Sequence, residues 1–226
     1  WMETGYLSSN GVCFDIGMTT RAALDRWRRG DKTDTACGPV NPRSAGNGAL
    51  MRLAPAAMFY ADRAEAVRHA GLSSPTTHGA PESVDACRLF GAMLHDALHG
   101  VDKSSLLFGQ GVASLSTPAV RAVAEGGWRD KPEAAIRGSG YVTDCLEAAL
   151  WCFHTTDNYR EAVLRAVNLG DDTDTTAAVC GQLAGAYYGV DAIPEDWRRR
   201  LAQGDRLLML ADQLLRHRVP DRSGAS

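Results

Sequence analysis

The chain has 226 residues, which suits one domain or two small ones, and 45% of them are hydrophobic, which favours a folded core over global disorder. Its 24 lysines and arginines nearly balance 27 aspartates and glutamates, so the net charge of −3 lacks the basic excess of a nucleic-acid-binding protein. The six cysteines form no CxxC pair, which argues against a zinc cluster or dense disulfides and favours a reduced, cytoplasmic setting. No apolar run is long enough to cross a bilayer, so we expect no membrane span.

Apolar residues recur mainly with the helical period, and they predict seven helices. In chain order these helices cover about 49–60 with a break near Ala54 caused by Pro55, 82–99, 143–153 with Thr143 as the cap, 159–168, 177–188, 194–201 and 205–218. Segment 177–188 is apolar nearly all round and is therefore expected to be central. No stretch alternates like a strand, so we predict an all-α protein.

Three segments rich in Gly, Pro and Ser, at about 30–48, 109–117 and 128–140, are predicted to be long loops, where binding function usually lies. We expect one domain over residues 1–220 and a disordered tail over 221–226.

Residues 171–176 are the most informative stretch, because they place three carboxylates and three hydroxyls at the start of a helix. Such oxygens suit Mg²⁺ or Mn²⁺, and Asp172, Asp174 and Thr175 are the candidates that could converge on an ion. The alternative is an N-cap, in which acids and threonines satisfy free amides and complement the helix dipole. One such residue would be enough for a cap, and the surplus carboxylates repel one another without a cation. Both interpretations stay open from the residues alone.

Three glycine-flanked loops are candidates for phosphate binding through backbone N–H groups: 46–48, 109–111 and 138–140. The first directly precedes a predicted helix, and the third leads into Tyr141, an aromatic residue suited to stacking on a base or ribose. Ordinary turn chemistry is the alternative for each loop.

Single polar residues add weaker hypotheses. Asp15 stands between apolar neighbours, as either a hydrogen-bonded structural carboxylate or a group poised for acid–base work. His78 lies in a polar loop. His95 and His99 have the spacing of a zinc-binding helix, but their place at a helix end favours a structural role.

Four blocks in order along the chain together resemble the ADP-ribosylglycohydrolase family, and in particular its bacterial members similar to dinitrogenase reductase-activating glycohydrolase. The blocks are 5–17, 46–55, 140–151 and 168–178 with its 184–189 tail. The resemblance implies a single-domain orthogonal helical bundle that uses a pair of Mg²⁺ or Mn²⁺ ions. It implies hydrolysis of the glycosidic bond between ADP-ribose and an acceptor, an arginine side chain or a related ADP-ribosyl compound.

By motif position, the resemblance makes Asp172, Asp174 and Thr175 metal ligands. Asp15, Asp172 and Asp174 become the catalytic candidates, with Asp15 beside the ribose as a base or orienting group. The residues expected to line the ADP-ribose cleft are Gly46, Asn47, Gly48, His78, Gly140 and Tyr141. The partner is then ADP-ribose on a protein or small molecule.

One departure from the family pattern matters. The family carries an earlier Thr-Asp-Asp metal motif, and this chain begins after the place where that motif would stand. The Trp1-Met2 start also suggests a fragment, so we expect this chain to supply half of the metal ligands. The alternative function is a catalytically silent ADP-ribose-binding or structural protein.

Overall fold

The computed structural model describes residues 1–30, 36–108, 111 and 115–220. Within these ranges the secondary structure is helical, with two isolated β-bridges and no strand, so the all-α prediction is confirmed. The α-helices are α1 (Met18–Arg28), α2 (Ala54–Phe59), α3 (Arg63–Ser73), α4 (Pro81–Leu98), α5 (Lys103–Phe108), α6 (Pro118–Ala124), α7 (Val142–His154), α8 (Tyr159–Asn168), α9 (Thr173–Tyr188), α10 (Glu195–Arg200) and α11 (Gly204–Arg216). The predicted tail 221–226 and residues 109–110 of the second glycine loop lie outside the described residues.

Two local predictions need correction. The predicted break near Ala54 is present, but the part before it is not an α-helix, because a short 3-10 turn covers Asn47–Ala49 and α2 starts at Ala54, which places Pro55 in the first turn. A proline is accepted there because a first-turn amide has no partner within the helix. Thr143 is not the cap of α7, because Tyr141 takes the N-cap position and no side chain caps that helix.

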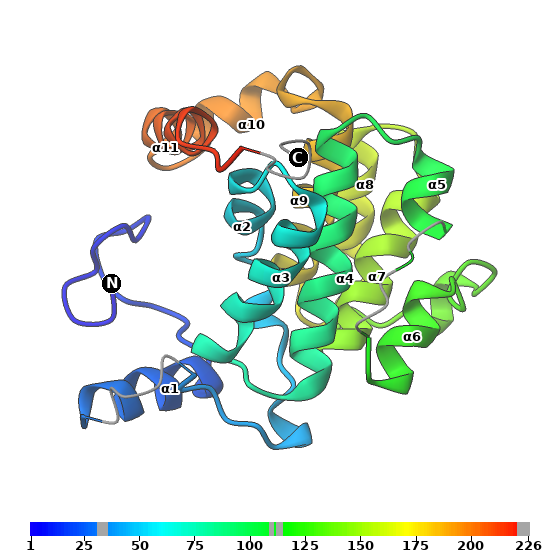
Figure 1. Ribbon diagram of the computed structural model, residues 1–226. Coiled ribbons are helices and arrows are strands. Elements are labelled where there is room, and N and C mark those ends of the chain that lie inside the picture. Colours follow the sequence, from blue (N-terminus) through cyan, green and yellow to red (C-terminus); the bar gives the residue numbers. More distant parts are fainter. Residues whose placement is uncertain (31–35, 109–110, 112–114, 221–226) are drawn as a thin grey trace, which may run out of the picture.

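Helix α4 runs through the middle of the molecule, with α3 on one side and α7 on the other (Figure 1). Its buried Phe90, Met93 and Leu94 share one core with Leu146 and Leu150 of α7. Helix α9 packs on α4, α7 and α8, so it is central as predicted, but it is not buried all round. The starts of α4, α7 and α9 each follow a polar loop, and these loops build the candidate site.

Helix α1 lies at one end of this body and α10 and α11 cross the other end (Figure 1), while the N-terminal arm reaches α11, where Arg206 donates to the Tyr6 hydroxyl at 2.7 Å. His95 and His99 stack on each other at the end of α4, where His95 Nε2 is hydrogen-bonded to the Ala61 carbonyl and Arg218 donates to His99. The structural interpretation of this histidine pair is therefore supported.

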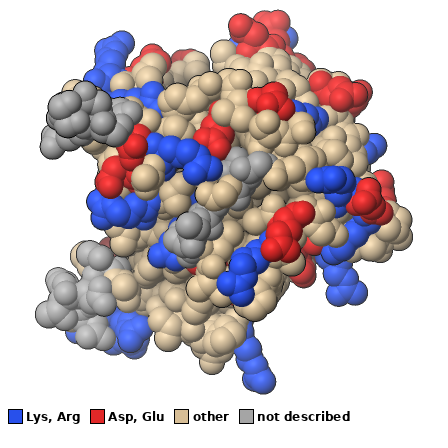
Figure 2. Space-filling view, turned by 45° about the vertical axis from the view of Figure 1, so that its right-hand side comes forward, with Lys and Arg blue, Asp and Glu red and all other residues tan. Residues whose placement is uncertain are grey.

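Basic and acidic side chains are interspersed over the face shown in Figure 2, and no large patch of one sign covers it. In the described part of the chain, no helix is long and apolar enough to cross a membrane.

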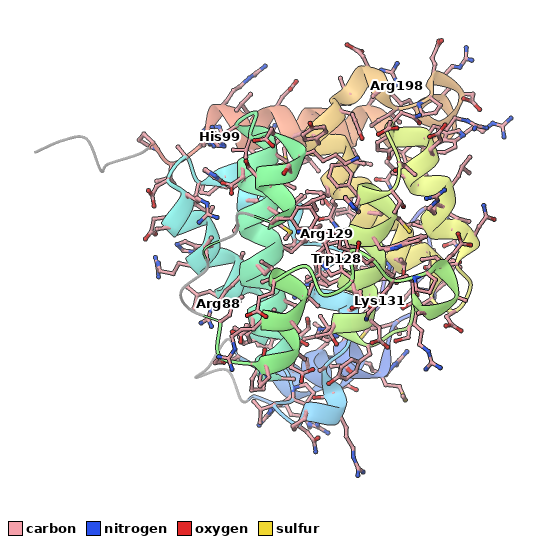
Figure 3. The ribbon with its side chains drawn as sticks, turned by 90° about the vertical axis from the view of Figure 1, so that its right-hand side faces the viewer. Arg88, His99, Trp128, Arg129, Lys131 and Arg198 are labelled. Atoms are coloured by element: carbon pink, nitrogen blue, oxygen red, sulfur yellow. The ribbon has the colours of Figure 1, made fainter. Side chains whose placement is uncertain are left out.

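A buried tryptophan anchors the loop between α6 and α7 against the edge of the bundle (Figure 3). Trp128 donates its indole N–H to the Val123 carbonyl and stacks on Phe108 of α5. The guanidinium of Arg129 lies 3.7 Å from the centre of the same Phe108 ring. This loop precedes the Gly138–Gly140 segment, so its anchoring fixes where that segment reaches the site.

Candidate functional site

Three loops from distant parts of the sequence are joined by backbone hydrogen bonds at one end of the bundle. The Asn47 amide donates to the Gly140 carbonyl at 3.1 Å, and the Val142 amide donates to the Ala45 carbonyl at 2.9 Å. The Asp172 amide donates to the Gly138 carbonyl at 2.8 Å. Loop 138–140 therefore lies between the 45–48 turn and the start of α9, and it brings their side chains together.

The side chain of Asn47 completes this junction. Its Nδ2 donates to Oδ2 of Asp172 at 2.8 Å and approaches the Ser139 carbonyl at 3.4 Å. Asn47 is only 7% exposed, and a buried amide is stable only when it is hydrogen-bonded. The bond therefore fixes one oxygen of the Asp172 carboxylate.

Local backbone geometry presents Asp172. Gly170 and Asp171 both have left-handed φ values, +87° and +59°, conformations that Gly adopts freely and Asp tolerates better than most residues. Asp172 occupies the N-cap position of α9, but its side chain accepts no helix amide. The N-cap alternative therefore does not account for this carboxylate, which is turned toward Asn47 instead.

The next turn of α9 supplies the other two predicted ligands. Asp174 is exposed, whereas Thr175 is only 6% exposed and its hydroxyl has no hydrogen-bond partner among the described residues. Two carboxylates and an unpartnered hydroxyl form an oxygen donor set of the kind that hard divalent cations prefer. Within the described ranges, no three His, Cys, Asp or Glu side chains come together as a metal site.

The glycines of these loops allow close approach between backbone segments. A Cβ on Gly138 would lie 3.1 Å from Thr176 Oγ1 and 3.2 Å from the Gly170 carbonyl oxygen. The Gly46 amide already donates to Ser44 and the Asn47 amide to Gly140. These two amides already have backbone partners, and phosphate binding at the 46–48 loop stays a prediction.

His78 packs against the turn formed by Gly46, Asn47 and Gly48. A Cβ on Gly48 would lie 2.8 Å from His78 Cε1, so the ring edge fills the space that the missing side chain leaves. The side chain is 3% exposed. Burial, together with the positive charge of Arg52, lowers the pKa of His78 to about 4, so the imidazole is neutral at pH 7.

Tyr141 stands at the rim of the site, 36% exposed, and its hydroxyl donates to the carboxylate of Glu82 in the first turn of α4. That hydrogen bond, with burial, raises the pKa of Tyr141 to about 12. Nothing in the sequence singled out Glu82, because an acid in a first turn is ordinary helix chemistry.

Loop 138–140 has a second partner that the sequence did not reveal. Ser139 Oγ donates to Asp144 in the first turn of α7 at 2.7 Å, and the Tyr141 amide donates to Ser139 Oγ at 3.1 Å. This local pattern fixes the backbone beside Gly140. A Cβ added to Gly140 would lie 3.6 Å from Asp172 Oδ2.

Asp15 lies apart from this cluster, since no described hydrogen bond joins it to the cluster and it is not next to any of these residues in the chain. Its side chain is exposed and its φ is +47°, in the N-terminal arm. Its apolar neighbour Phe14 is itself about half exposed, so apolar neighbours in the sequence do not bury this carboxylate. Its catalytic role stays a prediction.

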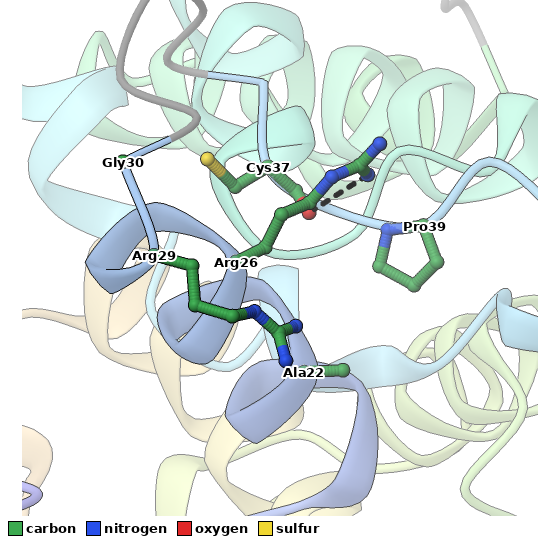
Figure 4. Close-up of a pocket in the computed structure, with 6 residues that line it drawn as sticks. All are labelled: Ala22, Arg26, Arg29, Gly30, Cys37 and Pro39. Carbon is green, nitrogen blue, oxygen red and sulfur yellow. Dashed lines mark hydrogen bonds between the residues drawn. The ribbon is translucent and has the colours of Figure 1, made fainter.

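A hollow of about 610 Å³ lies elsewhere, between α1 and the segment around Cys37 and Pro39 (Figure 4). Arg26 and Arg29 line it, and Arg26 donates to the Cys37 carbonyl at 3.5 Å. None of its lining residues belongs to the predicted site.

The fold and the site define an all-helical protein with a polar, acid-rich site built from loops at the helix starts. The sequence model of the ADP-ribosylglycohydrolase family matches residues 1–223, and the chain belongs to that family.

Similar proteins agree with this assignment. The chain is 43% identical to the ADP-ribosylarginine hydrolase Tri1 of Pseudomonas putida (strain GB-1) and 40% identical to that of Serratia proteamaculans (strain 568), in each case over 95% of its length. It is 34% identical, over 87% of its length, to the ADP-ribosyl-[dinitrogen reductase] glycohydrolase of Rhodospirillum rubrum, of which the match covers 66%. A solved structure of an ADP-ribosylglycohydrolase-related protein complex superposes with a TM-score of 0.80 at 40% identity, covering 90% of this chain and 70% of that one. The chain spans only 57% and 58% of the two Tri1 proteins.

Proposed function

We propose that this protein hydrolyses the glycosidic bond between ADP-ribose and an arginine side chain, with Mg²⁺ or Mn²⁺ as cofactor and in the cytoplasm. The observation that carries the proposal is the convergence of Asn47, His78, Tyr141 and Asp172 on one loop cluster, beside Asp174 and Thr175. The two Tri1 relatives are named as ADP-ribosylarginine hydrolases, which favours arginine as the acceptor.

Asp172, Asp174 and Thr175 would hold the cation. A divalent ion bound there supplies Lewis acidity and activates water near neutral pH. The family resemblance implies further ligands beyond these three, and water is a usual oxygen ligand of such ions.

The chain's own residues have separable roles in the proposal. Glycosidic bonds break through a state with positive charge on the sugar ring, and the carboxylates of Asp172 and Asp174 would stabilise that charge. Asn47 keeps the Asp172 carboxylate in place. His78 and Tyr141 would orient the ADP-ribose unit, and Asp15 is the candidate base or orienting group beside the ribose.

The test measures ADP-ribose release from ADP-ribosylarginine while Mn²⁺ is titrated. Asp174→Ala is expected to lower the rate by at least roughly 100-fold, since even changes beyond the direct ligands of a metal cost 10- to 100-fold. Asp191→Ala, at a highly exposed acid in another loop, is the matched control and is expected to leave the rate unchanged.

Retained metal-dependent release in Asp174→Ala would overturn the proposed ligand set. Calorimetry with ADP-ribose, with and without Mg²⁺, tests the alternative function on the same protein. Binding of ADP-ribose without release from modified arginine would establish a silent ADP-ribose-binding protein instead.

A further inference from the structure

Hydrogen bonds and close packing fix the backbone at His78, independently of the contacts that its side chain makes. Its amide donates to the Ser74 carbonyl at 2.7 Å, and its carbonyl accepts from Ser74 Oγ at 2.7 Å. Gly38 closes the other side, because a Cβ there would lie 2.5 Å from the His78 amide nitrogen. The imidazole therefore starts from a fixed point beside the Gly46–Gly48 turn.

Thr77 and Arg52 lie on the Nδ1 side of the imidazole. His78 Nδ1 lies 2.8 Å from Thr77 Oγ1, and Arg52 donates from Nη2 to the same Thr77 oxygen at 2.8 Å. A guanidinium only donates, so Thr77 must accept from Arg52. Thr77 keeps its hydroxyl proton and one lone pair for other partners, and among the described residues Nδ1 is the acceptor placed to take that proton.

A neutral imidazole that accepts at Nδ1 carries its proton on Nε2. Here Nε2 faces the turn, since a Cβ on Gly48 or Gly46 would lie 3.1 Å or 3.3 Å from it. Nε2 has no hydrogen-bond partner among the described residues. It is also not sealed inside the protein, unlike the unpartnered Thr117 Oγ1 and Arg218 Nε. The His78 side chain is 97% buried, and the unpartnered Nε2 is the ring atom that lies against the Gly46–Gly48 turn of the candidate site.

We propose that Arg52 and Thr77 are positioning residues that hold His78 as the Nε2–H tautomer, a neutral donor that binds an acceptor oxygen of the ADP-ribose unit at the Gly46–Gly48 turn. The choice of ligand rests on the proposed function, whereas the tautomer does not. The low pKa of His78 agrees with this arrangement, because it keeps the ring neutral at pH 7.

The tautomer can be measured without any ligand. Long-range ¹H–¹⁵N correlation spectra of the imidazole identify the protonated nitrogen, because Nε2 couples to both ring protons whereas Nδ1 couples strongly to one. The 226-residue protein at pH 7 is expected to give the Nε2–H pattern for His78. An Nδ1–H pattern in the unmodified protein would overturn the proposal.

The series of hydrogen bonds from Arg52 through Thr77 to His78 Nδ1, here called the relay, is tested by Thr77→Val. This substitution removes the hydroxyl and keeps the shape of the side chain. His78 is expected to lose its single tautomer, and the Kd for ADP-ribose is expected to rise roughly three- to tenfold, the size of one hydrogen bond. Thr77→Ser restores the hydroxyl and is expected to restore both properties.

Thr76→Val is the matched control. Thr76 Oγ1 also accepts from Arg52 Nη2, at 3.0 Å, but it donates to the Ser73 carbonyl and does not reach His78. This variant is expected to keep the tautomer and the ADP-ribose affinity. Equal effects of Thr76→Val and Thr77→Val on the tautomer and on the Kd would mean that both substitutions act through a general loss of stability. That result would overturn the relay.

The ligand assignment can fail separately. If His78 shows the Nε2–H pattern and loses it in Thr77→Val, but no form of the protein binds ADP-ribose, the tautomer relay stands and the ADP-ribose ligand is overturned together with the proposed function. If ADP-ribose binds with the same Kd in Thr77→Val and unmodified protein, the positioning role is overturned while the proposed function survives.

Discussion

Asn47 Nδ2 lies 2.8 Å from Oδ2 of Asp172, although 125 residues separate the two in the chain. This bond joins the turn before α2 to the start of α9, and both ends belong to the predicted site. Because Asn47 is buried and its acceptor is a carboxylate oxygen, the bond ties the stability of the fold to the geometry of the proposed metal ligand.

Asn47→Ala is therefore expected to lower the free energy of unfolding by about 1.5–3 kcal/mol, the range for a hydrogen bond to a charged group. Urea unfolding followed by circular dichroism measures this. Asn168→Ala is the control, because Asn168 donates to the Leu164 carbonyl on an exposed helix end and should cost under about 0.5 kcal/mol. Equal costs for the two variants would show that the Asn47–Asp172 bond contributes nothing special.

The close packing of loop 138–140 on α9 predicts a second effect. In Gly138→Ala the new methyl group would meet Thr176 Oγ1 and the Gly170 carbonyl at little over 3 Å, so we expect a loss of about 1–3 kcal/mol. Gly17→Ala is the matched control, since its φ is −62° and nothing lies within 4 Å of the added carbon. Thermal unfolding compares the two, and a Gly138→Ala protein as stable as Gly17→Ala would contradict the packing argument.

Several elements of the fold could be predicted from the sequence, and the reason is local. Helix α8 was predicted with the same ends that the structure has, because its amphipathic pattern is strong and Asn158 caps it by accepting from the Glu161 amide. Helix α3 was missed because its buried residues are small. A Cβ on Gly91 of α4 would lie 2.5 Å from Ala70 Cβ, so the two helices touch through Gly and Ala and leave no large apolar stripe to detect.

The residues of the candidate site also include some that could be predicted from the sequence and some that could not. The family resemblance identified Asn47 and His78 as candidates, residue types also pointed to Tyr141 and Asp172, and the structure joins the four by contacts that span most of the chain. Their partners Glu82 and Thr77 were not identifiable, because each matters only through a neighbour that the fold supplies. Periodicity describes a helix but carries no information on which loops meet.

A buried carboxylate on α4 predicts a third effect, away from the site. Asp85 is 1% exposed and accepts hydrogen bonds from the Ser116 and Thr117 amides before α6. Burial pushes the pKa of Asp85 upward, but these hydrogen bonds outweigh it and lower the pKa below its usual value. The carboxylate is thus stabilised in its charged form.

Asp85→Ala is expected to cost about 3–5 kcal/mol, because it leaves buried amides without an acceptor and removes the buried carboxylate that pairs with Arg88 at 3.0 Å. Asp102→Ala is the control: Asp102 also accepts from a helix-start amide, that of Ser105, but at an exposed site, so about 1 kcal/mol is expected. Denaturant unfolding of both variants measures the difference. A similar cost for the two would show that burial adds nothing to the Asp85 cap.

The depressed pKa of His78 predicts how stability changes with pH. The pKa is about 4 in the folded chain and about 6.5 when unfolded, so between these values the unfolded chain binds a proton that the folded chain does not. The contribution of His78 is therefore complete above about pH 7, and it is lost as the pH falls from about 6.5 to 4. The full loss is about 3 kcal/mol, from 1.36 kcal/mol per pKa unit.

His78→Gln isolates this term, because glutamine has no charge to gain. The free energy of unfolding of the two proteins, measured by urea at intervals from pH 4 to 8, should differ by an amount that changes through pH 4–6.5 and is constant above pH 7. Acidic residues titrate in both proteins and so cancel in the difference. A difference that is flat from pH 4 to 8 would mean that His78 titrates alike in the folded and unfolded chain, and that burial beside Arg52 does not keep it neutral.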